Sequence, residues 1–419
     1  MGKTKNRWLI ALSAIAIHLS IGSAYAYSVF KKPIENSMGW SGTEIALAFT
    51  LALICLGLSA AVFGRFVEKY GPSKSAMVSA VLFSTGQIGS GFAIAQESLT
   101  MFLILYGVVG GMGLGIGYIS PVSTLVKWFP DRRGLATGMA VFGFGAGALI
   151  TGPIAADMIA DFGISSTFYT LGIAYFILMM LGASYIARPP EGWMLEGMKT
   201  GLASGKAGVN QDLAQLTANE AVKTKRFWLL WVMILINISA GLMIISVASP
   251  MGQEMVGMEV AAAAAMVGIM GIFNGAGRIG WAGISDYIGR SNVFAVFFSI
   301  QIIAFLIIPN VTNAVAFQAL ILIVMTCYGG GFASLPAFIG DMFGTKQLGA
   351  IHGYILTAWS MAGVVGPIIV ARMKEATGSY VPAFYIFAAL LAVALVVTYF
   401  IKQDINKIRK QQASQQKVA

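Results

Sequence analysis

The feature that most limits how this chain can fold is a series of apolar runs, each long enough to cross a bilayer as a helix. A membrane-spanning helix needs about 20 mostly apolar residues. Only 11% of the residues are charged, against about 25% in soluble domains, so a soluble fold could not bury this much apolar surface. We therefore expect an all-α membrane protein with twelve transmembrane helices, at 8–30, 44–64, 75–95, 100–126, 134–158, 166–187, 227–250, 260–283, 292–309, 313–338, 348–371 and 380–401.

One long polar stretch, residues 188–226, divides these runs into two sets of six. It predicts a cytoplasmic linker between an N-terminal half at 1–187 and a C-terminal half at 227–401. The basic, Gln-rich residues 402–419 are expected to form a cytoplasmic tail that frays or lies at the membrane surface. The first run is too long for the apolar core of a cleavable signal, so we expect it to remain as the first span.

The positions of lysine and arginine predict the orientation in the membrane. All but five of the 27 lie between spans on the side of the N-terminus; the exceptions are Lys31, Lys32, Arg278, Arg372 and Lys374. Because cytoplasmic loops carry the excess of basic residues, both termini are expected to be cytoplasmic in a plasma or inner cell membrane. The net charge of +10 is therefore explained by basic residues on the cytoplasmic side of the lipid bilayer, and no nucleic-acid partner is expected.

One of these cations, Arg278, lies inside a span that reads GIMGIFNGAGRIGWAGISDYIGR from 268 to 290. An arginine at the bilayer centre costs about 2.5–3.5 kcal/mol on insertion scales. None of the 17 acidic residues falls clearly at mid-span, so the protein offers it no obvious carboxylate. A guanidinium binds carboxylates in a bidentate manner, which predicts a visiting anion. The alternative is an arginine satisfied by backbone carbonyls or reaching the cytoplasmic edge.

Asn274 precedes Arg278 by one helical turn, so both side chains are expected on the same side of the helix. Asn274 is predicted to position the guanidinium or to bond the substrate, with bonding between helices as the alternative.

The two halves repeat each other weakly. The loop after the second span reads GRFVEKYGPSK, and the loop after the eighth reads GISDYIGRSN. The fourth and tenth spans each contain a proline, Pro121 and Pro336. Two parallel six-helix repeats are typical of a transporter that rocks one half against the other.

The charged residues near these loops are predicted to form cytoplasmic salt bridges between helices when the site faces outward, the alternative being that they only set topology. They are Arg65, Glu68, Lys74, Arg132, Arg133, Asp286, Arg290 and Asp341.

The loop pattern G-x-x-x-D/E-x-x-G at 64–71, which recurs at 283–289 with one residue fewer before the acid, resembles the signature of the major facilitator superfamily. Within it, WFPDRRGLATG at 128–138 resembles the loop after the fourth helix in the monocarboxylate and oxalate/formate branch, which includes bacterial monocarboxylate and lactate transporters. The resemblance implies two six-helix bundles with a midplane site for small carboxylates, reached by alternating access. It also implies that Arg278 anchors the anion.

The same resemblance suggests where the rest of the pocket lies. It implies that Tyr118 faces the cavity and that Tyr25, Tyr328 and Trp359 line it; Phe144 is a further candidate wall. The alternative for these aromatic residues is packing between helices. Trp359 stands where the oxalate/formate exchanger has a lysine. A pocket with one cation suits a short monocarboxylate, because a dicarboxylate would need a second cation to offset its desolvation.

The function predicted is secondary active transport of small monocarboxylates such as lactate or pyruvate, with proton symport favoured. A carboxylate exchanger and a transporter-like sensor are the alternatives. His18 and His352 are the candidates for a proton path, since histidine titrates near neutral pH, the alternative being that each only bonds a neighbouring helix. An enzyme is not expected, because the spans hold no nucleophile–base pair or cluster of metal ligands. No cofactor is predicted, and a monomer is expected.

Overall fold

The computed structural model describes residues 5–190, 193 and 212–418, and within them every regular element is a helix. The N-terminal half contains α1 (Arg7–Gly22), η1 (Ser23–Ala26), α2 (Tyr27–Met38), α3 (Gly42–Tyr70), α4 (Pro72–Ala95), α5 (Leu99–Phe102), η2 (Leu103–Gly110), α6 (Gly111–Trp128) and α7 (Arg133–Tyr185). The C-terminal half contains α10 (Lys225–Val256), α11 (Val260–Ile288), α12 (Arg290–Ile307), η3 (Ile308–Asn310), α13 (Ala314–Phe343), α14 (Leu348–Thr377) and α15 (Val381–Val418). The predicted all-α membrane fold is confirmed.

Eleven of the described helices are long and apolar enough to cross a membrane, one fewer than the twelve predicted spans. The difference lies in α7, whose 53 residues bend at Gly163. Gly163 has φ +80°, a conformation that residues with a side chain rarely adopt. The predicted spans 134–158 and 166–187 are the two arms on either side of this bend, so the chain crosses twelve times.

The two halves form separate bundles that meet mainly along two pairs of helices, α3 with α14 and α7 with α11, with further contacts between α7 and α13. Small residues allow the close approach at the first pair. A Cβ added to Gly64 would lie 2.6 Å from the carbonyl oxygen of Gly349, so no larger residue fits at that crossing. The candidate functional site described below is built from helices of both bundles at this junction.

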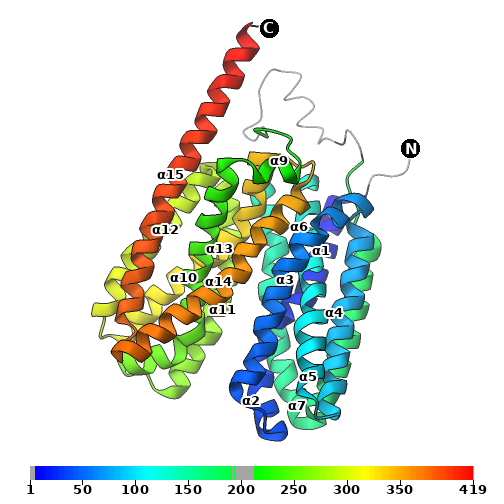
Figure 1. The fold of residues 1–419 in the computed structure, drawn as a ribbon, viewed down its shortest axis with the longest axis vertical. Helices are drawn as coiled ribbons and strands as arrows, with labels where there is room; N and C mark the ends of the chain where they lie inside the picture. The colour runs from blue at the N-terminus through cyan, green and yellow to red at the C-terminus, as the bar shows by residue number, and fades with distance from the viewer. Residues whose placement is uncertain (1–4, 191–192, 194–211, 419) are drawn as a thin grey trace.

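Helix α1 begins and helix α15 ends at the same end of the bundle, which is called the termini face below (Figure 1). α15 continues as one helix through residues 402–418 and projects beyond the bundle. The expectation that residues 402–418 fray is therefore wrong, because the helical hydrogen bonds of the last span continue through them.

The described part of the predicted linker packs against the termini face. The backbone N–H of Leu213 donates to the Asp341 carbonyl at 3.0 Å, and that of Leu216 donates to the Phe343 carbonyl at 2.8 Å. A short helix, α9 (Ala218–Val222), then leads into α10. Residues 191–192 and 194–211 of the predicted linker lie outside the described residues.

Candidate functional site

Arg278 lies in the C-terminal half of α11 with only 1% of its surface exposed. Its Nε donates to Asn274 Oδ1 at 3.2 Å, and its Nη1 donates to the Val141 carbonyl on α7 at 2.6 Å. No carboxylate among the described residues pairs with it. The structure thus contains part of the alternative predicted for Arg278, one backbone carbonyl, but leaves its charge without a counter-ion from the described chain.

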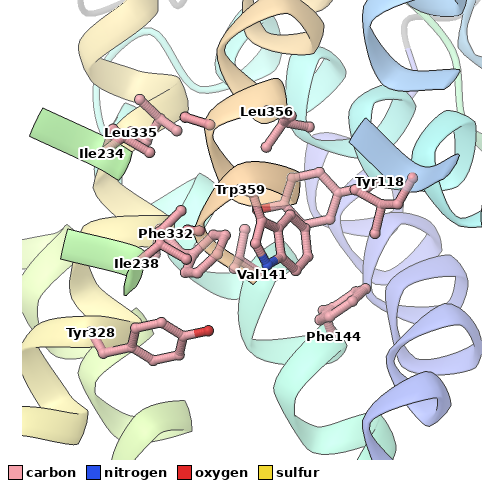
Figure 2. Packing of buried hydrophobic residues seen from close by; sticks show 14 of the residues in the cluster. Tyr118, Val141, Phe144, Ile234, Ile238, Tyr328, Phe332, Leu335, Leu356 and Trp359 are labelled. Carbon is pink, nitrogen blue, oxygen red and sulfur yellow. The ribbon is translucent and has the colours of Figure 1, made fainter. Parts of the chain in front are cut away.

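Aromatic rings enclose the guanidinium from both halves. Its central carbon lies 5.9 Å from the ring centroids of Phe144 on α7 and of Phe332 on α13. Trp359 on α14 lies against both of these rings, at 5.9 and 4.7 Å between centroids. Figure 2 shows these residues converging from helices of the two bundles. Phe332 was not predicted, although it follows Tyr328 by one turn and so shares its side of the helix.

Four polar groups around these rings are buried without a hydrogen-bond partner in the described chain: the hydroxyls of Tyr25, Tyr118 and Tyr328 and the indole N–H of Trp359. Leaving a buried polar group unpaired costs about 1–3 kcal/mol, and most such groups in proteins are paired. The hydroxyl of Tyr328 points toward the side of the cluster where Trp359 and Phe144 lie (Figure 2). All four groups belong to residues predicted to line the pocket, and together with Arg278 they can receive a small polar ligand.

The two histidines lie on either side of Tyr118. The His18 ring stacks on Tyr118 with centroids 5.2 Å apart, and the His352 ring lies 5.7 Å from Tyr118. His18 contacts two backbone carbonyl oxygens, that of Ala140 through Nδ1 at 2.8 Å and that of Tyr118 through Nε2 at 3.1 Å. Both ring nitrogens of His352 are buried and lack a partner among the described residues.

A cluster of charges joins the halves at the termini face, between α7 and the ends of α11 and α13. Arg133 pairs with Asp341 at 3.0 Å and with Asp212 of the linker. Arg290 pairs with Asp286 at 2.6 Å and with Asp341 at 3.1 Å. The Asp286 carboxylate also accepts the backbone N–H groups of Gly134 and Leu135, at 2.8 and 3.0 Å, in the first turn of α7.

A second cluster repeats this arrangement with the halves exchanged. Glu68 at the end of α3 accepts the backbone N–H of Gly349 at 2.8 Å, in the first turn of α14. Lys127 pairs with Glu68 at 2.8 Å. In each cluster the acid of one half's loop signature therefore binds the start of a helix in the other half, where exposed N–H groups favour a negative charge.

Three of the eight residues predicted to form salt bridges are not in ion pairs among the described residues. The Arg65 guanidinium donates instead to the hydroxyl of Tyr354, at 2.7 Å, and to Asn219. Lys74 and Arg132 have no carboxylate within 4.0 Å in the described chain. Two residues that the sequence does not single out are in ion pairs instead, Lys127 with Glu68 and Asp212 with Arg133.

The hydrogen bonds between the two halves in the described chain lie level with Arg278 and Trp359 or nearer the termini face. Besides the two charge clusters they include Thr137 to the Ala333 carbonyl at 2.7 Å and Ser360 to the Leu53 carbonyl at 2.9 Å. The halves are thus fastened together on one side of Arg278, and this conformation is closed at the termini face.

Similar proteins of known family help to interpret this site. A family model described as Major Facilitator Superfamily matches residues 13–367 and 281–418. The chain is 28% identical over 403 residues to the oxalate:formate antiporter of Oxalobacter formigenes, covering 96% of this chain and 92% of that protein. It is 23% identical over 398 residues to monocarboxylate transporter 11 of Mus musculus, covering 92% and 85%. In structure it resembles the transporter FucP in its outward conformation, with a TM-score of 0.73, 14% identity, and coverage of 94% and 98%.

Proposed function

This chain belongs to the major facilitator superfamily, whose members are transporters rather than enzymes, and from that premise we propose that it is a secondary active transporter of small monocarboxylates. The observation that carries the proposal is Arg278, a buried cation with no carboxylate partner in the described chain. We propose further that the termini face is cytoplasmic, because most of the lysine and arginine lies on that side.

The polar groups around Arg278 favour a single carboxylate as the ligand. A carboxylate accepts a bidentate pair of bonds from the guanidinium, and its remaining lone pairs suit the unpaired hydroxyls of Tyr118 and Tyr328. The rest of the wall is aromatic and apolar, through Phe144, Phe332 and Trp359. A second carboxylate would have to be desolvated against these rings without a second guanidinium or ammonium group, which disfavours dicarboxylates.

Binding is linked to movement through the bond between Arg278 and Val141, because it joins the C-terminal half to the N-terminal half. A carboxylate that takes the guanidinium competes with this carbonyl and weakens one fastening between the bundles. The two charge clusters then have to separate for the site to reach the cytoplasm. A ligand that favours one arrangement over the other shifts the balance between the two conformations.

Exchange of one carboxylate for another is the second candidate mode. It is favoured by the similarity over nearly the whole chain to a protein whose name is oxalate:formate antiporter. Symport and exchange differ in one measurable respect, because only symport accumulates substrate under a proton gradient.

The test is transport in proteoliposomes with radiolabelled formate, acetate, lactate, pyruvate and oxalate, with and without an inward proton gradient. We expect saturable counterflow of the monocarboxylates and weak or no flux of oxalate. Binding without counterflow of any of the five would reject the transporter in favour of a sensor. Oxalate flux equal to that of the monocarboxylates would refute the argument from a single anchoring cation.

A further inference from the structure

The imidazole of His18 is held between two groups that can only accept hydrogen bonds. Nδ1 lies 2.8 Å from the carbonyl oxygen of Ala140 on α7, and Nε2 lies 3.1 Å from that of Tyr118 on α6. A neutral imidazole carries one N–H, so in that form one ring nitrogen directs its lone pair at a carbonyl oxygen. Only the imidazolium donates to both oxygens.

We propose that His18 is the proton-binding residue of the transporter and that its imidazolium is held by the carbonyls of Ala140 and Tyr118. The inference rests on the proposed function, because a proton bound here drives transport only if the protein also carries the anion.

His18 and Arg278 lie close enough for their charges to interact. Arg278 donates to the Val141 carbonyl, which directly follows the Ala140 carbonyl that His18 contacts. Both side chains also face the Phe144 ring, His18 at 6.2 Å between centroids and the Arg278 guanidinium carbon at 5.9 Å. Two like charges in a poorly solvated region repel each other, and an anion on Arg278 offsets that repulsion. A proton on His18 and a carboxylate on Arg278 therefore favour each other's binding by the same factor.

The other ionisable groups near His18 leave this coupling in place. Tyr118 on α6 stacks on the ring, Tyr25 in η1 reaches the same Phe144 ring at 5.0 Å, and His352 on α14 lies beyond Tyr118. In the described part of the chain no acidic side chain pairs with His18 or Arg278. The substrate is thus the anion that can balance the added proton.

His352, the second histidine of the chain, lacks among the described residues the carbonyl contacts that His18 has. Both nitrogens of His352 are buried without an acceptor in the described chain, so nothing there stabilises its imidazolium. His18, in turn, has both N–H positions occupied by carbonyls and supplies charge without a hydrogen bond to the ligand. It therefore adds no binding group for a second carboxylate, which agrees with a monocarboxylate substrate.

The experiment compares wild type, His18→Gln and the matched control His352→Gln in proteoliposomes with radiolabelled lactate and a pH-sensitive dye inside. In wild type and in His352→Gln, inward lactate flux should be accompanied by acidification of the lumen and stimulated by an inward proton gradient. In His18→Gln the ratio of uptake with and without the gradient should fall to about 1, because no proton binds with the anion. Exchange of lactate across the bilayer should persist in His18→Gln at a reduced rate.

Three other results would each contradict a different part of the reasoning. Acidification by His18→Gln at the wild-type stoichiometry would overturn the assignment of His18. Net uptake of lactate by wild type without acidification of the lumen would overturn the proton site while leaving carboxylate transport intact. Absence of lactate, formate and acetate counterflow in wild type would instead reject the proposed function.

Should His18→Gln fail to fold, the control variant decides the question alone, because His352→Gln leaves His18 as the single histidine. Nitrogen-15 spectra of its ring should show two protonated nitrogens when lactate is bound, and lactate should bind more tightly as the pH falls. A neutral imidazole at every pH at which lactate binds would overturn the proposal.

Discussion

Replacing Arg278 with lysine is the most direct test of how the anion is held. Lysine keeps the positive charge but lacks the planar guanidinium, so it cannot bind a carboxylate through two parallel hydrogen bonds. Its single ammonium group also cannot keep the contacts with Asn274 Oδ1 and the Val141 carbonyl while it binds the ligand. A hydrogen bond to a charged group contributes about 1.5–3 kcal/mol, so losing one of the two bonds to the ligand should weaken the Kd for lactate about 10- to 150-fold.

The assay is equilibrium binding of radiolabelled lactate to purified protein, followed by uptake in proteoliposomes. The matched control is Arg226→Lys, a second buried arginine, which lies at the start of α10 against the Phe343 ring and away from the site. It should leave the Kd unchanged. If Arg278→Lys binds lactate within threefold of wild type while the control behaves as expected, the guanidinium is a structural group and the anion is held elsewhere.

Four further outcomes are expected. Tyr328→Phe should leave the melting temperature unchanged or raise it, since the hydroxyl has no partner in the described chain. It should also weaken lactate binding about 2- to 12-fold, the range for a neutral hydrogen bond of about 0.5–1.5 kcal/mol; unchanged affinity would remove Tyr328 from the site. Asp286→Asn breaks a buried pair and the cap of α7, a loss of about 3–5 kcal/mol for comparable pairs. It should speed labelling by an impermeant reagent, added at the termini face, of a cysteine placed at Ser123, which is buried on α6 beside Gly349. Asp212→Asn removes one of two carboxylates from Arg133 and should speed the same labelling to a smaller extent, which equal rates in the two variants would contradict. Arg372→Ala removes an exposed pair with Glu375 and should change neither stability nor uptake measurably, so a clear change in either would show that surface charge matters more than its exposure suggests.

Much of the fold could be predicted from the chain because the bilayer restricts it so strongly. Spans must be apolar helices of a minimum length, and basic loops indicate their orientation. The continuous helix at 402–418 was missed because its polar residues carry no membrane signal, while helical hydrogen bonding continues from α15 without interruption. The bend at Gly163 was anticipated only as a boundary between two runs.

The site was harder to predict, since it depends on which faces of different helices meet. Arg278, Asn274 and Tyr328 stand out because polar groups are rare in such spans. Phe332 does not, since one phenylalanine among 26 has no distinguishing feature in the sequence. The partners of Glu68 and Asp286 were predicted as side chains, whereas backbone N–H groups of the opposite half supply much of the binding. Donors of that kind belong to every residue except proline and leave no trace in composition.

These contacts between a carboxylate and the main chain determine which mutations the protein tolerates at the termini face. On one side of each contact stands a single carboxylate, Asp286 or Glu68, that no other side chain replaces. On the other side the donor is the main chain at Gly134 or Gly349, which most codon changes cannot delete. The sensitivity there is to added volume: a Cβ at Gly349 would lie 3.1 Å from Glu68 Oε1, and one at Gly134 would collide with the carbonyl of Ala282. A genetic selection for transporters that no longer close should therefore recover many different replacements of the two acids. At the two glycines it should recover chiefly bulky residues and proline.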